Sequence, residues 1–344
     1  MVPTASVFNE APKAQPVRFE QLYTQVKPGL SALAELMNAQ VEDFEPEIRE
    51  LVEYTLENSG KRLRPMLMFF SGSNGTDSVN PDLVKAAAVV EMVHIATLVH
   101  DDILDDAALR HRKETVAQKF GTTVAVLLGD ALFAHALKLA SDFKTVRVCQ
   151  VVASATQRVC SGEISQTLRR GNPDLSRESY FRIIEMKTAE LFQASCTLGA
   201  ELSDGDPAFV EAAGTFGKHL GIAYQIFDDL TDLYGEEETT GKTLGTDLAS
   251  GKITLPMLAM KEEIGETVFN NLFIHAKTKD PQALAHFHRE LRAPKVKAAV
   301  IESFNAEIEA ARNAINDFSD LSAHAPLFKL CDFVSQQLNS LSAR

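Results

Sequence analysis

The sequence lacks tryptophan entirely and has only 18 glycines and 13 prolines among its 344 residues. A chain built from short strands and tight turns needs more of these turn-forming residues, so an all-β fold is disfavoured. The four cysteines show no CxxC spacing, which argues against a zinc site or a disulfide framework. We interpret them as reduced core thiols of a cytoplasmic protein: Cys149, Cys160, Cys196 and Cys331.

Two kinds of membrane signal are also missing. No run of about 18 uncharged apolar residues is evident, which predicts that the chain has no transmembrane segment. Residues 1–15 contain no basic stretch followed by an apolar stretch, so they do not resemble a secretory signal. With three prolines, residues 1–18 are instead predicted to form a flexible N-terminal lead-in.

Positive charge is scarce, because 34 Lys and Arg face 47 Asp and Glu and the formal net charge is −13. This excess of negative charge argues against nucleic acid as a partner. An anionic small molecule is compatible with it only where basic side chains or metal ions gather locally.

The pattern of apolar residues in the sequence indicates helices. Hydrophobic residues make up 45% of the chain, and they recur at helical spacing from Phe19 onward. No stretch alternates polar and apolar residues strongly enough to predict a strand. We therefore predict one all-α domain over residues 19–344.

Two aspartate clusters each follow a long apolar helix. The first, at residues 101–106, closes the apolar run from Ala86 to Val99, and the second lies at residues 228–232. Asp101 and Asp105 share one helical face, where like charges repel at a helix end that is already negative. A solvated acidic face would tolerate this, but a continuation of a buried helix calls for cations. Carboxylate oxygens suit Mg²⁺, which shares its coordination with substrate phosphates.

Basic side chains are concentrated in a few places. Three cations occur within Gly60–Pro65, either as a surface helix start or as an anion clamp, and a basic loop follows the first cluster at residues 109–113. Lys187 stands among apolar residues, so it needs an anionic partner or must extend its ammonium group to water. Arg169 and Arg170 are interpreted as a solvated helix end. Carboxylates, metal ions and dispersed cations describe a diphosphate site, and the aliphatic surroundings suit an isoprenoid tail.

These motifs together resemble the all-trans polyprenyl (isoprenyl) diphosphate synthase family. They are Gly-Lys-Arg-x-x-Pro at 60–65, DDxxD at 101–105, Lys-Thr at 187–188, Gln-x-x-Asp-Asp-x-x-Asp at 225–232 and Gly-Lys-x-Thr-Leu-Pro at 251–256. Each is weak alone, but all five occur in the family's order. The resemblance implies an isoprenoid-synthase-type helical bundle around a central cavity, usually a homodimer.

The resemblance also implies roles for the matched residues. Those implied to hold the cofactor Mg²⁺ are Asp101, Asp105, Asp228 and Asp232, supported by Asp229. Those implied to hold isopentenyl diphosphate are Lys61, Arg64 and His94, with His111 or Arg112. Those implied to hold the allylic diphosphate are Arg110, Lys187, Thr188, Gln225, Lys242 and Lys252. The residues implied to be catalytic are Asp101, Asp105, Lys187 and Asp228.

The implied reaction is ionisation, condensation and elimination. Metal ions and cations stabilise the diphosphate that leaves the allylic substrate, and the double bond of isopentenyl diphosphate attacks the carbocation that remains. Loss of a proton then yields a longer all-trans polyprenyl diphosphate. Catalysis is mainly electrostatic preorganisation and positioning, with water excluded.

The sequence departs from the family pattern in the basic loop. The family usually has Arg-Arg-Gly after the first cluster, where this chain has Arg110-His111-Arg112. A neutral imidazole gives no bidentate clamp. Either Arg112 takes over the contact with isopentenyl diphosphate, His111 binds as imidazolium, or that site is weak.

Ala96 and Thr97, one turn before Asp101, are implied to set the floor of the tail cavity. Aromatic residues there give short products in the family, so these small residues favour a medium or long chain, as in octaprenyl-type synthases. The alternative is a short-chain farnesyl or geranylgeranyl diphosphate synthase whose floor lies elsewhere, for example at Phe133 or Leu137.

Four other interpretations compete. The ExxH spacing of Glu91 and His94 occurs in di-iron bundles, but no second ExxH follows. A class I terpene cyclase shares the DDxxD motif but lacks the Gly-Lys-Arg motif. HD-type phosphohydrolases share His100-Asp101 but need further histidine ligands. A non-catalytic subunit of a heteromeric prenyl synthase tends to lose cluster aspartates, and this chain keeps both clusters.

Overall fold

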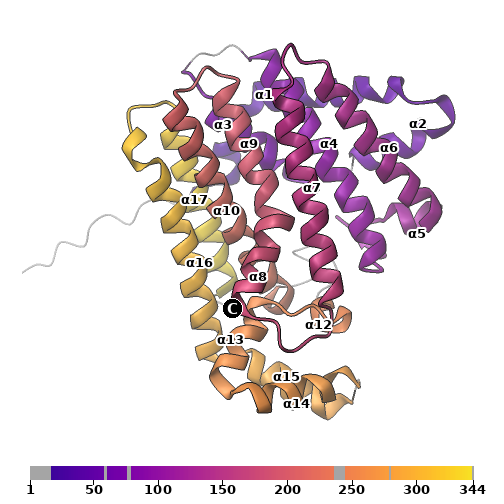
Figure 1. Ribbon diagram of the computed structural model, residues 1–344, viewed down its shortest axis with the longest axis vertical. Helices are drawn as coiled ribbons and strands as arrows, with labels where there is room; N and C mark the ends of the chain where they lie inside the picture. The colour runs from indigo at the N-terminus through magenta and orange to yellow at the C-terminus, as the bar shows by residue number, and fades with distance from the viewer. Residues whose placement is uncertain (1–16, 58–59, 76–78, 236–244, 279, 343–344) are drawn as a thin grey trace, which may run out of the picture.

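The structure, a computed structural model, describes residues 17–342 except 58–59, 76–78, 236–244 and 279. Nearly all of its regular structure is helical (Figure 1). The strands of this part are β1 (Leu109–Arg110) and β2 (Lys113–Glu114), which pair as one short antiparallel hairpin. The predicted all-α fold is confirmed.

The helices of the first half surround α4. Their bounds are α1 (Phe19–Gln40), α2 (Arg49–Glu57), α3 (Leu63–Ser71), α4 (Pro81–Leu104), α5 (Val116–Phe120), α6 (Thr122–Ser141) and α7 (Arg147–Leu168). Two 3₁₀ turns, Val41–Asp43 and Pro46–Ile48, join α1 to α2.

The helices of the second half of the chain are α8 (Arg177–Ile184), α9 (Glu190–Glu201), α10 (Pro207–Tyr234), α12 (Thr246–Ser250), α13 (Leu255–Ile264), α14 (Glu266–Lys277), α15 (Pro281–Leu291), α16 (Pro294–Ile315) and α17 (His324–Ser342). In this half, α10 contacts α9, α16, α17, α13 and α8. A π-helical turn, Glu185–Ala189, joins α8 to α9, and a 3₁₀ turn, Asn316–Phe318, follows α16.

The two cluster-bearing helices start in the same way. The side chain of Asn80 accepts a hydrogen bond from the backbone at the start of α4, and Asp206 does so at the start of α10. Pro81 and Pro207 follow these caps, where a proline loses no helical hydrogen bond. Capping thus fixes where each helix begins, and its length carries the aspartates to its other end.

The core lies where α4 and α10 meet their neighbours. α4 packs against α6 and α3, and α10 packs against α9 and α16. A Cβ on Gly217 would lie 2.6 Å from the carbonyl oxygen of Phe192, and one on Gly221 would lie 2.6 Å from Cα of Ala189. The glycines of α10 therefore serve close packing against α9 and its preceding turn.

α4 and α6 are each long and apolar enough to cross a membrane, a property that the sequence analysis did not identify. The most apolar window of α4 is 72% buried within the protein, whereas that of α6 is 44% buried. A core helix accounts for the composition of α4. α6 leaves more of its apolar surface uncovered.

The cysteines only partly match the prediction of core thiols. Cys196 and Cys331 are buried, but Cys149 is intermediate and Cys160 is exposed, and all four are free. Burial raises the pKa of the Cys331 thiol to about 12. The two buried thiols are thus protonated and unreactive at neutral pH.

Candidate active site

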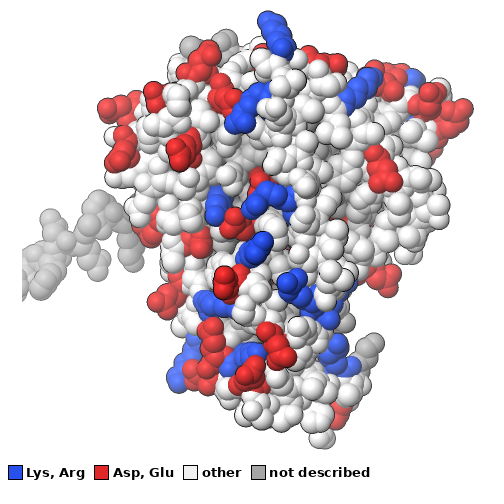
Figure 2. All heavy atoms as spheres, in the orientation of Figure 1, with Lys and Arg blue, Asp and Glu red and all other residues white. Residues whose placement is uncertain are grey.

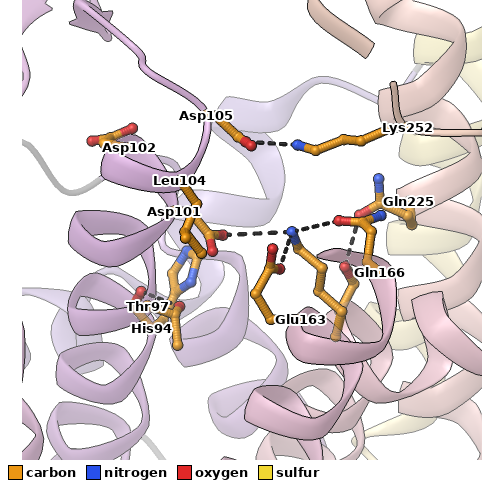
Figure 3. A network of polar contacts seen from close by, with 12 residues as sticks. His94, Thr97, Asp101, Asp102, Leu104, Asp105, Glu163, Gln166, Gln225 and Lys252 are labelled. Carbon is orange, nitrogen blue, oxygen red and sulfur yellow. Dashed lines mark hydrogen bonds and ion pairs between the residues drawn. The ribbon is translucent and has the colours of Figure 1, made fainter. Parts of the chain in front are cut away.

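The first aspartate cluster lies at the C-terminal end of α4. Asp105 caps this helix, and its backbone N–H donates to the carbonyl of Asp101 at 2.9 Å. Its Oδ1 accepts a hydrogen bond from Arg170 at 2.9 Å. Its Oδ2 accepts one from Nζ of Lys252 at 2.7 Å (Figure 3). Burial would raise the pKa of Asp105, but the charge and hydrogen bond of Lys252 lower it overall. This carboxylate is therefore ionised and paired with two cations.

Lys187 lies beside the same cluster, on the π-helical turn Glu185–Ala189. Such turns are frequent at functional sites. Its ammonium forms an ion pair with Glu163, donates to Oε1 of Gln166 at 3.0 Å, and lies 3.9 Å from Oδ2 of Asp101 (Figure 3). Burial would lower the pKa of Lys187, but Asp101 and Glu163 raise it. The residue is thus a permanent cation with the anionic partners that its apolar surroundings required.

In the second cluster, Asp229 is held by donors from the protein. The phenol of Tyr180 donates to its Oδ2 at 2.6 Å, Nε2 of Gln225 donates to its Oδ1 at 2.9 Å, and the backbone N–H of Leu255 lies 3.4 Å from Oδ2. Burial raises the pKa of Asp229 to about 6, although these hydrogen bonds oppose the rise. Asp229 is therefore engaged in hydrogen bonds within the protein.

Arg110 is bound to the first cluster and lies in the electrostatic field of the second. Its guanidinium donates from two nitrogens to Oδ1 of Asp102, at 2.8 and 2.7 Å. Burial would lower the pKa of Arg110, but Asp102 raises it overall, and Asp101 and Asp228 add to that effect. Because one guanidinium lies in the field of both clusters, the ends of α4 and α10 face the same site.

The hairpin turn after the first cluster consists of His111 and Arg112. Both residues have positive φ angles, 50° and 65°, as a two-residue hairpin turn requires. A Cβ on Gly60 would lie 3.0 Å from Nε2 of His111, so the imidazole packs against bare backbone next to the exposed Lys61. The hairpin therefore brings the basic loop to the Gly-Lys-Arg motif.

Two of the other residues predicted to hold isopentenyl diphosphate, Arg64 and His111, lie close enough to His94 to affect its charge. Burial lowers the pKa of His94 well below its usual value, and the nearby charges of Arg64, Arg110 and His111 lower it further. His94 is accordingly neutral at physiological pH, surrounded by cations. Such a cluster favours an anionic ligand.

Glu91 has a role that the sequence analysis did not find. It is 2% exposed, and burial raises its pKa while the charge of Arg64 opposes the rise. The guanidinium of Arg64 lies 4.9 Å above the ring of Phe192. Glu91 thus supplies the buried negative charge that faces Arg64, which accounts for this carboxylate without a di-iron site.

Thr188 and Gln225 extend the network toward the second cluster. The hydroxyl of Thr188 donates to Oε1 of Gln225 at 2.7 Å, and Gln225 in turn donates to Asp229. Lys242, also predicted to bind the allylic diphosphate, lies outside the described residues. The remaining allylic-site residues are all brought together.

The two residues predicted to form the cavity floor differ in exposure. Thr97 lies one turn below Asp101 on the same face of α4, with its side chain partly accessible (Figure 3). Its hydroxyl donates to the carbonyl of His94 at 2.6 Å. Ala96 has no accessible surface. Of the two, Thr97 therefore faces the site.

The interpretation of Arg170 as a solvated helix end is wrong. Besides its contact with Asp105, this side chain donates to the carbonyl of Leu104 at 3.0 Å, and it is only 21% exposed. Other residues of the network were also not predicted from the sequence: Glu163, Tyr180 and Asp247. Burial and the charge of Asp232 raise the pKa of Asp247 well above its usual value. None of these three residues stands out by spacing or by charge clustering in the sequence.

The donor groups of the two clusters fit Mg²⁺ shared with a ligand. Within the described ranges, no group of three His, Cys, Asp or Glu residues forms a metal site by itself. Mg²⁺ commonly takes only one or two carboxylates and completes its octahedron with water and substrate phosphate oxygens. An all-carboxylate set with cations nearby matches this preference. Figure 2 shows Lys and Arg atoms along the middle of the face that it displays, next to Asp and Glu atoms.

Comparison with known proteins supports the same conclusion. Residues 45–291 match the polyprenyl synthetase family. The chain belongs to this family. It is 33% identical over 242 residues to octaprenyl diphosphate synthase of Escherichia coli, covering 70% of this chain and 73% of that protein. It is 34% identical over 242 residues to heptaprenyl diphosphate synthase component 2 of Bacillus subtilis, covering 70% and 69%.

A solved structure shows the same fold. Polyprenyl synthase from Caulobacter crescentus, complexed with calcium and isoprenyl diphosphate, superposes with a TM-score of 0.85 at 29% identity, over 93% of this chain and 98% of that one. The resemblance inferred from the five motifs and the trans-prenyltransferase class are therefore confirmed. Family membership leaves the terpene cyclase and phosphohydrolase interpretations without support.

Proposed function

We propose that this chain is a Mg²⁺-dependent synthase that condenses isopentenyl diphosphate with an allylic diphosphate. It releases diphosphate and makes an all-trans polyprenyl diphosphate of medium or long chain. The observation that carries the proposal is the placement of Lys187 and Lys252 against Asp101 and Asp105, with Arg110 between the two clusters. An alternating arrangement of carboxylates and cations favours a phosphate-bearing ligand that binds together with metal ions.

The residues divide into three binding groups. The residues that would hold Mg²⁺ are Asp101, Asp105, Asp228 and Asp232. Bound Mg²⁺ would stabilise the negative charge on the leaving diphosphate. The residues that hold the allylic diphosphate are Arg110, Lys187, Thr188, Gln225 and Lys252, with Lys242 as a prediction from the motif. The residues that hold isopentenyl diphosphate are Lys61, Arg64 and His94, with His111 or Arg112. Fixed cations need no reorganisation as charge develops, which is how this arrangement lowers the barrier.

The small residues below the first cluster support a medium or long product. An isoprenoid tail grows away from the diphosphate, so we expect it to pass Thr97, whose side chain is short and partly accessible one turn below Asp101. The octaprenyl and heptaprenyl names of the relatives agree with this length.

The test is incubation of the purified chain with Mg²⁺, radiolabelled isopentenyl diphosphate and a series of allylic diphosphates, followed by measurement of product length. Products of about seven or more isoprene units support the proposal. Products that stop at three or four units identify a short-chain synthase, and Asp101→Asn and Asp228→Asn are the inactive controls.

We further propose that the active form is a homodimer that covers α6 and α7. Large apolar side chains are exposed on both helices: Leu127 (63%) on α6, and Ile164 (59%) and Leu168 (79%) on α7. α6 and α7 contact each other, so these side chains belong to neighbouring helices. A second copy would bury this apolar surface, which also explains the composition of α6 without a membrane.

The alternative is a heteromeric synthase, because the name of the Bacillus subtilis relative denotes one component of an enzyme. Light scattering after gel filtration, together with the elongation assay on the same fractions, distinguishes the two. A dimer that elongates alone supports the homodimer, and Leu127→Glu is expected to make it monomeric. An inactive chain that gains activity only with a second protein supports the heteromer. Cytoplasmic location stays a prediction.

A further inference from the structure

Arg170 occupies a place in the site that none of the five motifs assigns. It lies in the loop between α7 and α8, and its guanidinium spans two acceptors at the end of α4. One nitrogen donates to Oδ1 of Asp105 at 2.9 Å, and the other donates to the carbonyl of Leu104 at 3.0 Å. A planar guanidinium suits such a paired contact, and its charge also complements the negative end of the helix.

The loop that carries Arg170 is joined to the segment that carries Lys252. The backbone N–H of Gly171 donates to the carbonyl of Gly251 at 2.7 Å, and both glycines have positive φ angles, 75° and 73°. A Cβ on Gly251 would lie 3.1 Å from the nitrogen of Gly171, so the two backbones are in direct contact. Arg170 and Lys252 therefore reach the two oxygens of Asp105 from neighbouring backbone segments.

This arrangement has a consequence for metal binding. Both oxygens of Asp105 already accept a hydrogen bond from a cation, so a metal ion that approaches this carboxylate meets two positive charges. A diphosphate brings several negative oxygens, which are better partners for guanidinium and ammonium groups than a single carboxylate oxygen. Its arrival would release Asp105 for the metal.

We propose that Arg170 is a further residue of the diphosphate site, which contacts Asp105 and turns to the diphosphate when it binds. Metal ions then load onto Asp105 together with the diphosphate and not before it. This inference rests on the proposed function for the identity of the ligand, but its test needs no turnover.

The test compares Arg170→Gln with a matched control, Arg169→Gln. Both variants lose one positive charge from adjacent positions, but Arg169 is exposed, and among the residues that the structure describes its side chain donates to the carbonyl of Ser165, at 3.2 Å. The first measurement is binding of Mn²⁺ alone, which is monitored through the electron paramagnetic resonance signal of the free ion. The second is calorimetric binding of inorganic diphosphate at a fixed, saturating Mg²⁺ concentration.

The two measurements are expected to change in opposite directions. Arg170→Gln should bind Mn²⁺ alone about fivefold more tightly, because a competing cation is gone, and Mg²⁺–diphosphate about tenfold more weakly, because a charge-assisted contact is lost. Arg169→Gln should match the wild type in both. Arg170→Lys, which keeps the charge but not the paired geometry, should fall between the wild type and Arg170→Gln.

Three results would overturn the inference. They are unchanged binding in both measurements, equal changes in the Arg169→Gln control, and weaker binding of Mn²⁺ alone by Arg170→Gln with native circular dichroism. If Arg170→Gln has lost its fold, both kinds of binding weaken. The same two binding measurements on Arg170→Lys then test the inference. Failure of the elongation assay contradicts the proposed function but leaves both binding measurements interpretable.

Discussion

The phenol of Tyr180 donates a 2.6 Å hydrogen bond to Oδ2 of Asp229, and this buried bond ties α8 to the second aspartate cluster on α10. Tyr180 is 3% exposed and Asp229 is 6% exposed, so water cannot readily replace either partner. The bond favours the carboxylate form, and it is one reason why the pKa of Asp229 rises no further than about 6.

Tyr180→Phe is therefore expected to lower the free energy of unfolding by about 1–3 kcal/mol, as for loss of a buried hydrogen bond to a charged group. When folding raises the pKa of a carboxyl, the folded protein loses stability as pH rises from the unfolded-state pKa to the folded-state pKa. The variant raises the pKa of Asp229 further, so its deficit relative to wild type should be larger at pH 8 than at pH 5.

Urea denaturation at the two pH values measures this difference. Tyr23→Phe, at a 40% exposed position on α1, is the matched control and should change little. A deficit that is equal at pH 8 and pH 5 would show that the phenol contributes packing and not a bond to the ionised carboxylate.

His94 predicts a pH dependence of the opposite kind. Folding lowers the pKa of its imidazole well below the usual value, mainly through burial. As pH falls below about 6.5, the unfolded chain takes up a proton that the folded protein cannot hold, which costs at most about 1.4 kcal/mol per pH unit. His94→Gln should lose less stability between pH 7.5 and pH 5.5 than the wild type does.

Denaturant midpoints at these two pH values test the expectation. Replacement of the exposed His275 by Gln controls for the simple removal of an imidazole. An identical loss of stability in wild type and His94→Gln would mean that the folded protein accommodates an imidazolium at position 94.

The convergence of the two aspartate clusters was predicted from the sequence, but several of the residues that contact them were not. The two clusters follow apolar helices, so their convergence can be inferred from helical periodicity and from charge that requires a partner. Arg170 could not be found in this way, because its partner Asp105 is 65 residues away and the contact depends on the backbone of two loops. The pairing of Glu91 with Arg64 was not predicted either, because most of α4 is apolar and buried and its sequence does not indicate which cation this carboxylate meets.

His111 is expected to limit the affinity for isopentenyl diphosphate. It replaces the second arginine of the family pattern, and its ring lies against Gly60 beside Lys61. His111→Arg places a permanent charge at this position, so it should lower KM for isopentenyl diphosphate by up to about tenfold with kcat nearly unchanged. Steady-state kinetics at saturating allylic diphosphate provides the measurement.

Arg112→Gln is the companion variant, because Arg112 lies in the same turn and loses its charge without altering position 111. If His111 makes the contact, Arg112→Gln leaves KM unchanged. An unchanged KM in His111→Arg together with a raised KM in Arg112→Gln would assign the contact to Arg112.

Product length should respond to position 97 more cleanly than to position 96. Thr97 is partly accessible below Asp101, so Thr97→Phe can place its ring in the path of the tail, and shorter products are expected. Ala96 is fully buried, so Ala96→Phe must displace core neighbours, at a typical cost of about 1–3 kcal/mol.

A radiolabelled chain-length assay and thermal unfolding of the same preparations separate these effects. Thr97→Val, which keeps the size and removes the hydroxyl that donates to His94, should leave product length unchanged. Shorter products from Thr97→Phe at a nearly unchanged melting temperature identify the path of the tail. If Ala96→Phe alone shortens the product and remains stable, the tail passes on the other side of α4 and Thr97 is not its floor.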